Sequence, residues 1–230
     1  MSASIQVICF DLDDTLWPCE PVIQRAEQVL HQWLSLHYPR LTDQFSITDL
    51  RELRQQLCQR YPQFTHDLTA IRKISLALAA EQAGYDSQLI EPAFAIFHQA
   101  RNQVDFYADV LPNLKKLSQQ YKLGALTNGN ADLQQIGIRY FFDFVLSAYE
   151  VGVEKPHPAF FARACQYAQT EPEHIVHVGD DPNSDVAGAL TVGMRAVWLN
   201  RQQKTWSGER TPDATISSLV ELEAVLARWR

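Results

Sequence analysis

The sequence predicts an α/β protein in which a parallel sheet flanked by helices carries an inserted all-helical subdomain. Two observations support this fold class. Short apolar segments rich in β-branched residues alternate with helical stretches, which is the pattern of a parallel sheet. The segment 18–104 instead carries helix signals and almost no strand signals, so it predicts a subdomain of helices only. A chain of 230 residues is long enough for both parts.

The predicted strands are short and apolar, as expected for strands buried on both faces of a sheet. Four segments give this signal: Ile5–Phe10, Lys122–Leu126, Ile175–Val178 and Ala196–Leu199. Two weaker candidates, of which the second predicts a short edge strand, are Phe144–Ser147 and Ala214–Ile216. The helical stretches that separate the strands are Leu111–Gln120, Ala131–Ile136, Pro158–Ala168 and Asp185–Leu190.

The inserted segment predicts four helices. Apolar residues at helical spacing from Val22 to Leu34 predict the first helix. A similar pattern predicts the second, which follows Ser46 and Asp49, a pair that resembles a capping box. The third and fourth helices are expected at Asp67–Ala83, with Gly84 as the stop residue, and at about Gln88–Asn102.

The composition excludes some classes of protein. A formal net charge of -7 argues against a nucleic-acid binder, because affinity for the phosphate backbone depends on clustered Lys and Arg. No apolar stretch approaches the roughly 20 residues that cross a bilayer, and no signal peptide precedes the first strand. The four cysteines form no CxxC pair. We therefore expect a cytoplasmic monomer or homodimer that binds neither nucleic acid nor membrane.

The first candidate site is the motif Phe10–Leu16, at the end of the first strand. Asp11 and Asp13 are two residues apart, so in a strand they project to the same side. Two neighbouring carboxylates repel one another unless a cation or a proton separates them. Magnesium suits oxygen ligands of this kind, and a carboxylate can also attack phosphorus directly.

Three other interpretations of this motif compete with a phosphate site. An acidic turn without chemistry is one alternative. A calcium loop is a second, but counting from Asp11 places Leu16 where that loop needs glycine and Val22 where it needs glutamate. A glycine-rich phosphate loop is a third, and the chain has no such glycine pattern.

The second and third motifs supply a hydroxyl group and a cation. Thr127 and Asn128 lie where a strand ends and a helix opens, a place suited to phosphoryl oxygens, although the same residues also suit an ordinary turn. Lys155 precedes the pair of prolines that starts a helix, so rigid backbone holds it. A fixed ammonium group near the carboxylates offsets negative charge, whereas a solvated surface lysine is the alternative.

The fourth motif, Val178–Asp185, is again a strand that runs into an acidic loop. Asp180, at the strand end, is the best candidate ligand for a cation. Asp181 or Asp185 could instead cap the next helix, and which of the two supports Asp180 stays open.

The four motifs lie at strand ends in a compatible order, and together they resemble those of the haloacid dehalogenase-like superfamily of phosphohydrolases. The resemblance spans Ile5 to about Leu199 and includes DxDxT, a Thr-Asn turn, Lys-Pro and GDxxxxD. It implies a Rossmann-like catalytic core, residues 1–17 and 105–230, and a helical cap, residues 18–104, that closes over the core and selects the substrate.

The resemblance also implies a role for each motif residue in a Mg²⁺-dependent phosphatase acting on a small phosphate ester. Asp11 is expected to be the nucleophile and a metal ligand. Asp13 is expected to act first as the general acid and then as the general base, and its backbone carbonyl oxygen is expected to bind the metal as well. Thr127 and the amide of Asn128 are expected to hold phosphoryl oxygens, and Lys155 to steady the charge. The metal site is completed by Asp180 and oriented by Asp185.

Asp13 favours phosphate esters, because dehalogenases of the same superfamily lack the second aspartate. The cap resembles that of bacterial phosphatases acting on flavin mononucleotide and on the phosphorylated ribitylaminouracil of riboflavin synthesis. On this basis Trp17, His66 and Arg72 are candidate contacts for the leaving group, with packing an equal alternative for Trp17. A phosphomutase of the same fold and a non-catalytic binding protein are the other functions considered.

Overall fold

The computed structural model describes residues 4–229, and the chain forms two compact units. The sheet unit contains the chain up to Pro18, Phe106–Gly129 and the chain from Gly137 onward. The helical unit contains Cys19–Asp105 together with Asn130–Ile136. The sequence interpretation assigned this last segment to the core, whereas in the structure its contacts group it with the helices.

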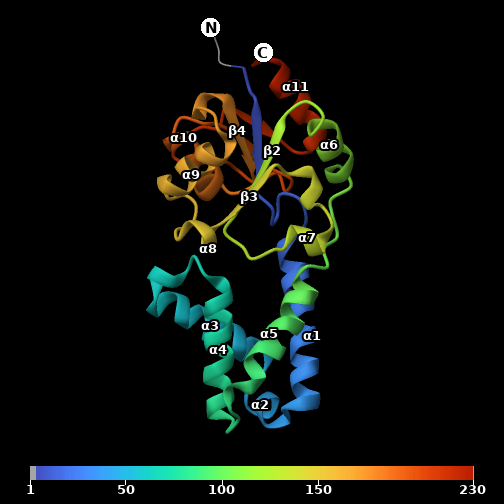
Figure 1. The fold of residues 1–230 in the computed structure, drawn as a ribbon, viewed down its shortest axis with the longest axis vertical. Coiled ribbons are helices and arrows are strands. Elements are labelled where there is room, and N and C mark those ends of the chain that lie inside the picture. Colours follow the sequence, from blue (N-terminus) through green and yellow to red (C-terminus); the bar gives the residue numbers. More distant parts are fainter. Residues whose placement is uncertain (1–3, 230) are drawn as a thin grey trace. The chain divides into compact units, whose positions relative to one another are not determined.

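The sheet unit is built on six parallel strands in the order β3-β2-β1-β4-β5-β6 (Figure 1). All six predicted strand segments are strands, and the α/β fold class is confirmed. Their bounds are β1 Val7–Phe10, β2 Lys122–Thr127, β3 Phe144–Ser147, β4 Ile175–Gly179, β5 Arg195–Leu199 and β6 Ala214–Ile216.

Helices cover both faces of this sheet, with α8, α9 and α10 on one side and α6 and α11 on the other (Figure 1). Phe160 and Phe161 of α9 are buried among the apolar residues of the sheet. The helix predicted at Asp185–Leu190 is instead a π-helical segment, Pro182–Ala187, followed by α10. The helices are α6 Val110–Leu117, α8 Ala148–Val151, α9 Pro158–Ala168, α10 Gly188–Thr191 and α11 Leu222–Ala227.

Between Cys19 and Asp105, the helical unit contains the four predicted α-helices and one short α-helix, α2, that the sequence interpretation missed. Pro39 begins α2, a favourable first position for proline because its fixed φ suits a helix and no N–H is lost. Ser46 and Asp49 form the expected capping box, and Gly84 has a φ of 71° after the third predicted helix. The bounds are α1 Cys19–His37, α2 Pro39–Gln44, α3 Ile47–Arg60, α4 Leu68–Gln82 and α5 Ile90–Arg101.

The segment Asn130–Ile136, which includes α7 (Leu133–Ile136), is held in the helical unit by hydrogen bonds to the end of α5. The backbone N–H of Asp132 donates to the Asn102 side-chain oxygen at 2.8 Å. His98 Nε2 lies 3.1 Å from the Asn130 carbonyl oxygen. The residues that directly follow Gly129 are therefore fixed by polar side chains that come from distant parts of the sequence.

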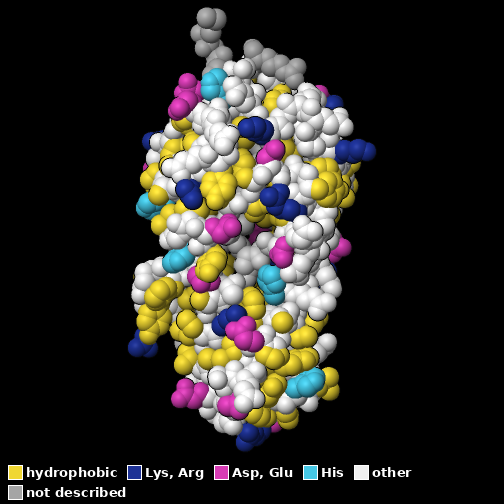
Figure 2. Space-filling view, in the orientation of Figure 1, with side chains coloured by type: hydrophobic (Ala, Val, Ile, Leu, Met, Phe, Trp, Pro, Cys, Tyr) yellow, Lys and Arg dark blue, Asp and Glu magenta, His cyan; other side chains and the backbone are white. Residues whose placement is uncertain are grey.

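The surface shown in Figure 2 carries both signs of charge. Lys and Arg side chains are scattered among Asp and Glu on this face rather than gathered into a basic patch. Within residues 4–229, no helix has the length and apolar character that crossing a membrane requires.

Candidate active site

The site lies at the carboxyl ends of the central strands, where β1, β2 and β4 each run into a motif loop. The Asp11 N–H donates to the Val178 carbonyl oxygen at 2.9 Å, which extends the pairing of β1 with β4 by one residue. This hydrogen bond fixes the backbone of Asp11 beside the start of the fourth motif. Residues 144 and more positions apart therefore meet at one edge of the sheet.

Lys155 is the centre of the polar network, and only 3% of its surface is exposed. Its ammonium group donates to Asp11 Oδ1 at 2.7 Å, to Asp185 Oδ1 at 2.7 Å and to the Leu126 carbonyl oxygen at 2.8 Å. Burial lowers the pKa of Lys155, but Asp11 and Asp185 outweigh burial and leave the pKa raised. The lysine is thus a fixed buried cation, and the surface-lysine alternative is wrong.

Asp185 is held from three directions. Its Oδ1 atom accepts from Lys155 and lies 2.9 Å from His177 Nε2, and its Oδ2 atom accepts from the Asp181 N–H at 3.1 Å. Burial raises the pKa of this carboxyl group, but Lys155 and His177 outweigh burial and lower it. A Cβ added at Gly179 would overlap the Asp185 carboxyl group, so only glycine at position 179 allows this carboxyl group to lie so close to the backbone.

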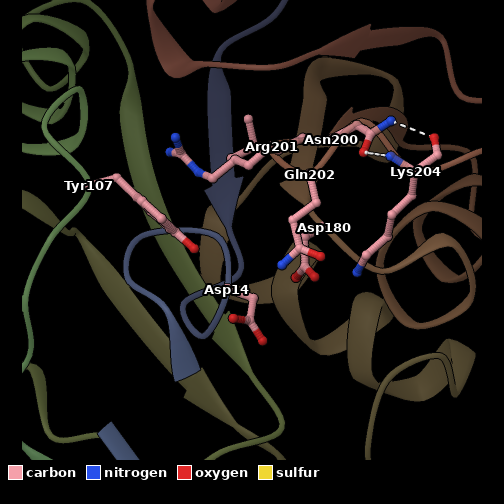
Figure 3. A pocket seen from close by; sticks show the side chains of 8 residues that line it. Asp14, Tyr107, Asp180, Asn200, Arg201, Gln202 and Lys204 are labelled. Carbon is pink, nitrogen blue, oxygen red and sulfur yellow. Dashed lines mark hydrogen bonds between the residues drawn. The ribbon is translucent and has the colours of Figure 1, made fainter. Parts of the chain in front are cut away.

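Asp180 faces a small pocket that also contains Asp14 and Lys204 (Figure 3). Burial raises the pKa of Asp180 to about 7, and Asp185 and Asp14 add to the effect. The Thr15 hydroxyl donates to Asp180 Oδ1 at 3.5 Å. Carboxylates are therefore crowded at this point, an arrangement that a bound cation stabilises.

The carboxylates of Asp11, Asp180 and Asp185 each bring an oxygen within 4.8 Å of the other two. An all-oxygen set of this kind fits a divalent cation such as Mg²⁺. Burial raises the pKa of Asp11 well above its ordinary value, Lys155 opposes this, and Asp185 adds to it. A cation among the three carboxylates would favour their ionised forms, so the residues present fit the expected metal.

Asp13 is oriented by Trp17. The indole N–H of Trp17 donates to Asp13 Oδ1 at 2.8 Å, and a backbone bridge joins the same two residues. The Trp17 side chain is fully buried and packs edge-on against Phe106, with ring centroids 5.8 Å apart. Trp17 therefore supports a candidate catalytic carboxylate, and contact between its ring and a leaving group stays a prediction.

The second motif is joined to the third by a reciprocal pair of hydrogen bonds. The Asn128 side chain donates to the Lys155 carbonyl oxygen at 3.0 Å and accepts from the Lys155 N–H at 2.8 Å. This pair uses the side-chain amide of Asn128, and contact of its backbone N–H with a phosphoryl oxygen stays a prediction. Thr127 is buried at the end of β2, and its hydroxyl accepts from the Gly129 N–H at 2.9 Å.

Two further residues fix the backbone of the first motif and were not identified from the sequence: Arg201, which contacts the motif, and Asp109, which contacts Arg201. The Arg201 guanidinium donates to the Thr15 carbonyl oxygen at 3.2 and 3.1 Å and to both carboxylate oxygens of Asp109 at 3.0 and 3.1 Å. Asp109 also accepts from the Ser218 hydroxyl and the Leu219 N–H, both at 2.7 Å. No local pattern could have indicated this anchor, because its members lie far apart in the sequence.

The other two candidate leaving-group contacts belong to the helical unit. His66 is half-buried and stands directly before Asp67, which caps α4. Arg72 is a buried residue of α4 whose guanidinium lies over the Phe97 ring, 3.4 Å from its centroid. Their contact with a substrate stays a prediction.

A sequence model of the haloacid dehalogenase-like hydrolases matches residues 5–193 of this chain. The chain is 33% identical to the 5-amino-6-(5-phospho-D-ribitylamino)uracil phosphatase YigB of Escherichia coli, and 96% of each protein is covered. It is 30% identical to the glyceraldehyde 3-phosphate phosphatase of Methanopyrus kandleri, over 86% of this chain and 84% of that protein.

Among solved structures, a protein described as a 2-haloacid dehalogenase from Pseudomonas syringae superposes with a TM-score of 0.92 at 43% identity, covering 98% of this chain and 100% of that one. A HAD phosphatase from Thermococcus onnurineus superposes with a TM-score of 0.69 at 28% identity, covering 96% of this chain and 98% of that one. The similar proteins thus carry the names of both phosphatases and dehalogenases.

Proposed function

This chain belongs to the haloacid dehalogenase-like hydrolases and is a phosphoric monoester hydrolase, and we propose that it works through an aspartyl-phosphate on Asp11. The observation that carries the proposal is the buried contact between Asp11 and Lys155, 2.7 Å from oxygen to nitrogen. One Asp11 oxygen is held by a fixed cation, while the second motif supplies a hydroxyl and an N–H beside it. A carboxylate oriented in this way is suited to attack phosphorus.

In the first step, an Asp11 oxygen forms a bond to phosphorus while the bond from phosphorus to the ester oxygen breaks. Asp13 gives its proton to the departing oxygen, and the Trp17 N–H keeps that carboxyl group in place. In the second step, Asp13 takes a proton from a water molecule that attacks the same phosphorus. The bond to Asp11 then breaks, and inorganic phosphate leaves.

Thr127 and the backbone N–H of Asn128 hold phosphoryl oxygens during both steps, and Lys155 offsets the charge that gathers on them. We propose that Asp11, Asp180 and the carbonyl oxygen of Asp13 hold Mg²⁺. When bound, the metal neutralises charge on the phosphoryl group. Asp185 orients this site, because its oxygens already accept from Lys155 and from the Asp181 N–H.

The proposed substrate is a small phosphorylated metabolite, with flavin mononucleotide and a riboflavin-pathway phosphate as the first candidates. Two observations support this class. The relative from Escherichia coli, similar over 96% of its length, is named for a phosphorylated ribitylaminouracil. Other relatives are named for small phosphate esters, glyceraldehyde 3-phosphate and phosphoserine among them.

The test is release of inorganic phosphate from a panel of phosphate esters, with flavin mononucleotide first, in the presence of Mg²⁺. We expect Asp11→Asn to abolish turnover without loss of fold, and Asp43→Asn, at an exposed position in the helical unit, to leave it unchanged. Full activity in Asp11→Asn would refute the proposed nucleophile. Conversion of a sugar phosphate to an isomer without phosphate release would instead indicate a phosphomutase.

A second candidate function, hydrolytic dehalogenation, has one observation in its favour: the 43% identity to a protein described as a 2-haloacid dehalogenase. Asp13 argues against it, because a halide leaves without a proton and the site would hold an acid that it does not need. Halide release from 2-chloropropionate, measured beside phosphate release, separates the two. We expect no halide above the level given by Asp11→Asn.

A further inference from the structure

Four charged residues from three helices meet inside the helical unit, and we call them the arginine cluster. Glu27 of α1, with 4% of its side chain exposed, is their common acceptor. Its carboxylate accepts from Arg51 of α3 at 2.6 Å and from Arg54 of the same helix, and it lies 3.8 Å from a nitrogen of Arg72 on α4. One carboxylate is thus the acidic partner of three guanidinium groups.

The cluster carries surplus positive charge. Among residues 4–229, the other carboxylate paired with the cluster is that of Glu20, which is mostly exposed, contacts only Arg51 of the three arginines, at 3.2 Å, and also accepts from the Gln24 side chain. Arginine stays protonated in proteins, so the surplus cannot be removed by losing a proton. A buried charge without a counter-charge is strongly unfavourable. Burial and the neighbouring Arg54 lower the pKa of Arg72 well below its ordinary value, although Glu27 opposes them.

Arg72 presents the incomplete part of the cluster. The residue is 8% exposed, its Nη1 atom is buried, and among residues 4–229 no group accepts a hydrogen bond from that atom. Its Nη2 atom lies 3.8 Å from Glu27, beyond hydrogen-bond distance. The Phe97 ring, 3.4 Å away, fixes the plane of the guanidinium. The side chain is therefore rigidly placed with donors that lack acceptors.

We propose that the arginine cluster is an oxyanion-binding site in which Arg72 and Arg54 hold a phosphate, sulfate or carboxylate group. A planar guanidinium matches such groups with two parallel hydrogen bonds, and one bound anion would both neutralise the surplus charge and accept from Nη1 of Arg72. The site lies wholly within the helical unit, so it does not depend on the proposed chemistry of Asp11. Its ligand is either a free oxyanion or an acidic group of a larger molecule, and the two sources are separable.

The first experiment is a titration of the full-length protein with sodium sulfate at constant ionic strength and with divalent metal chelated. Side-chain Nε–Hε NMR resonances of Arg51 and Arg54 report binding at the cluster itself, apart from any binding in the sheet unit. We expect saturable shifts in the wild type and an affinity roughly 10- to 100-fold weaker in Arg72→Gln, the effect of losing a charge-assisted hydrogen bond. Lys73→Gln, which removes a cation from the next position of α4, is the matched control and should bind like the wild type.

The second measurement is the Tm in chloride and in sulfate, which shows whether each variant is folded. Since Arg72→Gln removes surplus charge, its Tm in chloride should equal or exceed that of the wild type. Sulfate at ten times its Kd should raise the Tm of the wild type and of Lys73→Gln by about 3–6 °C and that of Arg72→Gln by much less. Arg54→Gln gives an independent test of the same loss of binding.

The source of the anion is tested with two phosphate esters that differ by one acidic group, 3-phosphoglycerate and glycerol 3-phosphate. If the cluster holds a second acidic group of the substrate, Arg72→Gln should lower kcat/KM more for the first ester than for the second. If it holds a free ion, the variant should affect the two esters equally and still lose sulfate binding. The proposal is overturned if sulfate shifts no arginine resonance in the wild type, if Arg72→Gln binds sulfate as the wild type does, or if removing this charge lowers the Tm in chloride by more than Lys73→Gln does.

Discussion

The ion pair of Asp109 and Arg201 is expected to determine both the stability of the sheet unit and the position of the first motif. Only 12% of the Asp109 side chain and 13% of the Arg201 side chain are exposed. Asp109→Asn keeps the shape of the side chain but leaves the Arg201 cation without its counter-charge. Loss of one partner of a largely buried pair costs about 3 kcal/mol, which corresponds to a fall in Tm of about 6–12 °C for a chain of this length.

The matched control is Asp105→Asn, the same substitution four positions earlier. Asp105 pairs with Arg25 at 3.1 Å, but their side chains are 84% and 38% exposed, so the loss should be about 1 kcal/mol or less. Thermal unfolding followed by tryptophan fluorescence suits this comparison, because Trp33 is the one tryptophan of the five that lies in the helical unit. Since Arg201 also holds the Thr15 carbonyl oxygen, we expect kcat/KM to fall by roughly 10- to 100-fold in Asp109→Asn alone.

The effect of Asp109→Asn should depend on pH in a defined direction. Burial raises the pKa of Asp109, but hydrogen bonds from Ser218, Arg201 and Leu219 outweigh burial and lower it. A lowered folded-state pKa gives stability that is complete above the unfolded pKa of about 3.9 and is lost as the pH falls through the folded value. The difference in Tm should therefore be full at pH 7 and shrink below about pH 4. Equal losses in the two variants, or a difference that grows as the pH falls, would refute this reasoning.

Three other changes test the site. Gly179→Ala should displace the Asp185 carboxyl group and lower kcat at least tenfold. Gly188→Ala instead crowds an aromatic ring in the core. It should cost about 1–3 kcal/mol of stability in unfolding assays and leave kcat near the wild-type value. Asn128→Ala should lose two hydrogen bonds to the Lys155 backbone, about 2 kcal/mol by denaturant titration, together with most of kcat. Chelation of divalent metal should abolish phosphate release and added Mg²⁺ should restore it, and activity that survives chelation would contradict the metal assignment.

The parts of this protein that the sequence predicted are those in which local pattern and burial agree. All six strands follow from apolar, β-branched segments, and the ends of three of them carry the motifs. Asp180 could be placed near Asp11 because parallel strands bring their carboxyl ends to one edge of the sheet, whereas Lys155 reaches the same edge from beyond α8. The third predicted helix was expected from Asp67, and in the structure Asp67 caps α4, its side chain accepting from the Ala70 N–H.

The features that the sequence did not predict depend on contacts between distant residues. The Asn102 side chain accepts a hydrogen bond that ties the segment Asn130–Ile136 to the helical unit. The spacing of apolar residues along the sequence does not reveal such a contact. Arg201 contacts Thr15 across 186 positions, so neither residue indicates the other. Trp17 was open to two interpretations because its position beside Asp13 suits a ligand contact as well as packing.

The central claim is that Asp11 itself becomes phosphorylated, and acid quenching within the first turnover tests it most directly. An acyl phosphate is reduced by borohydride, which converts the modified aspartate to homoserine, and peptide mass spectrometry then locates it. We expect homoserine at position 11 in the presence of substrate and Mg²⁺, and at neither position 13 nor position 180. Phosphate release in a single turnover without modification of Asp11, or with the label on another carboxylate, would contradict the account.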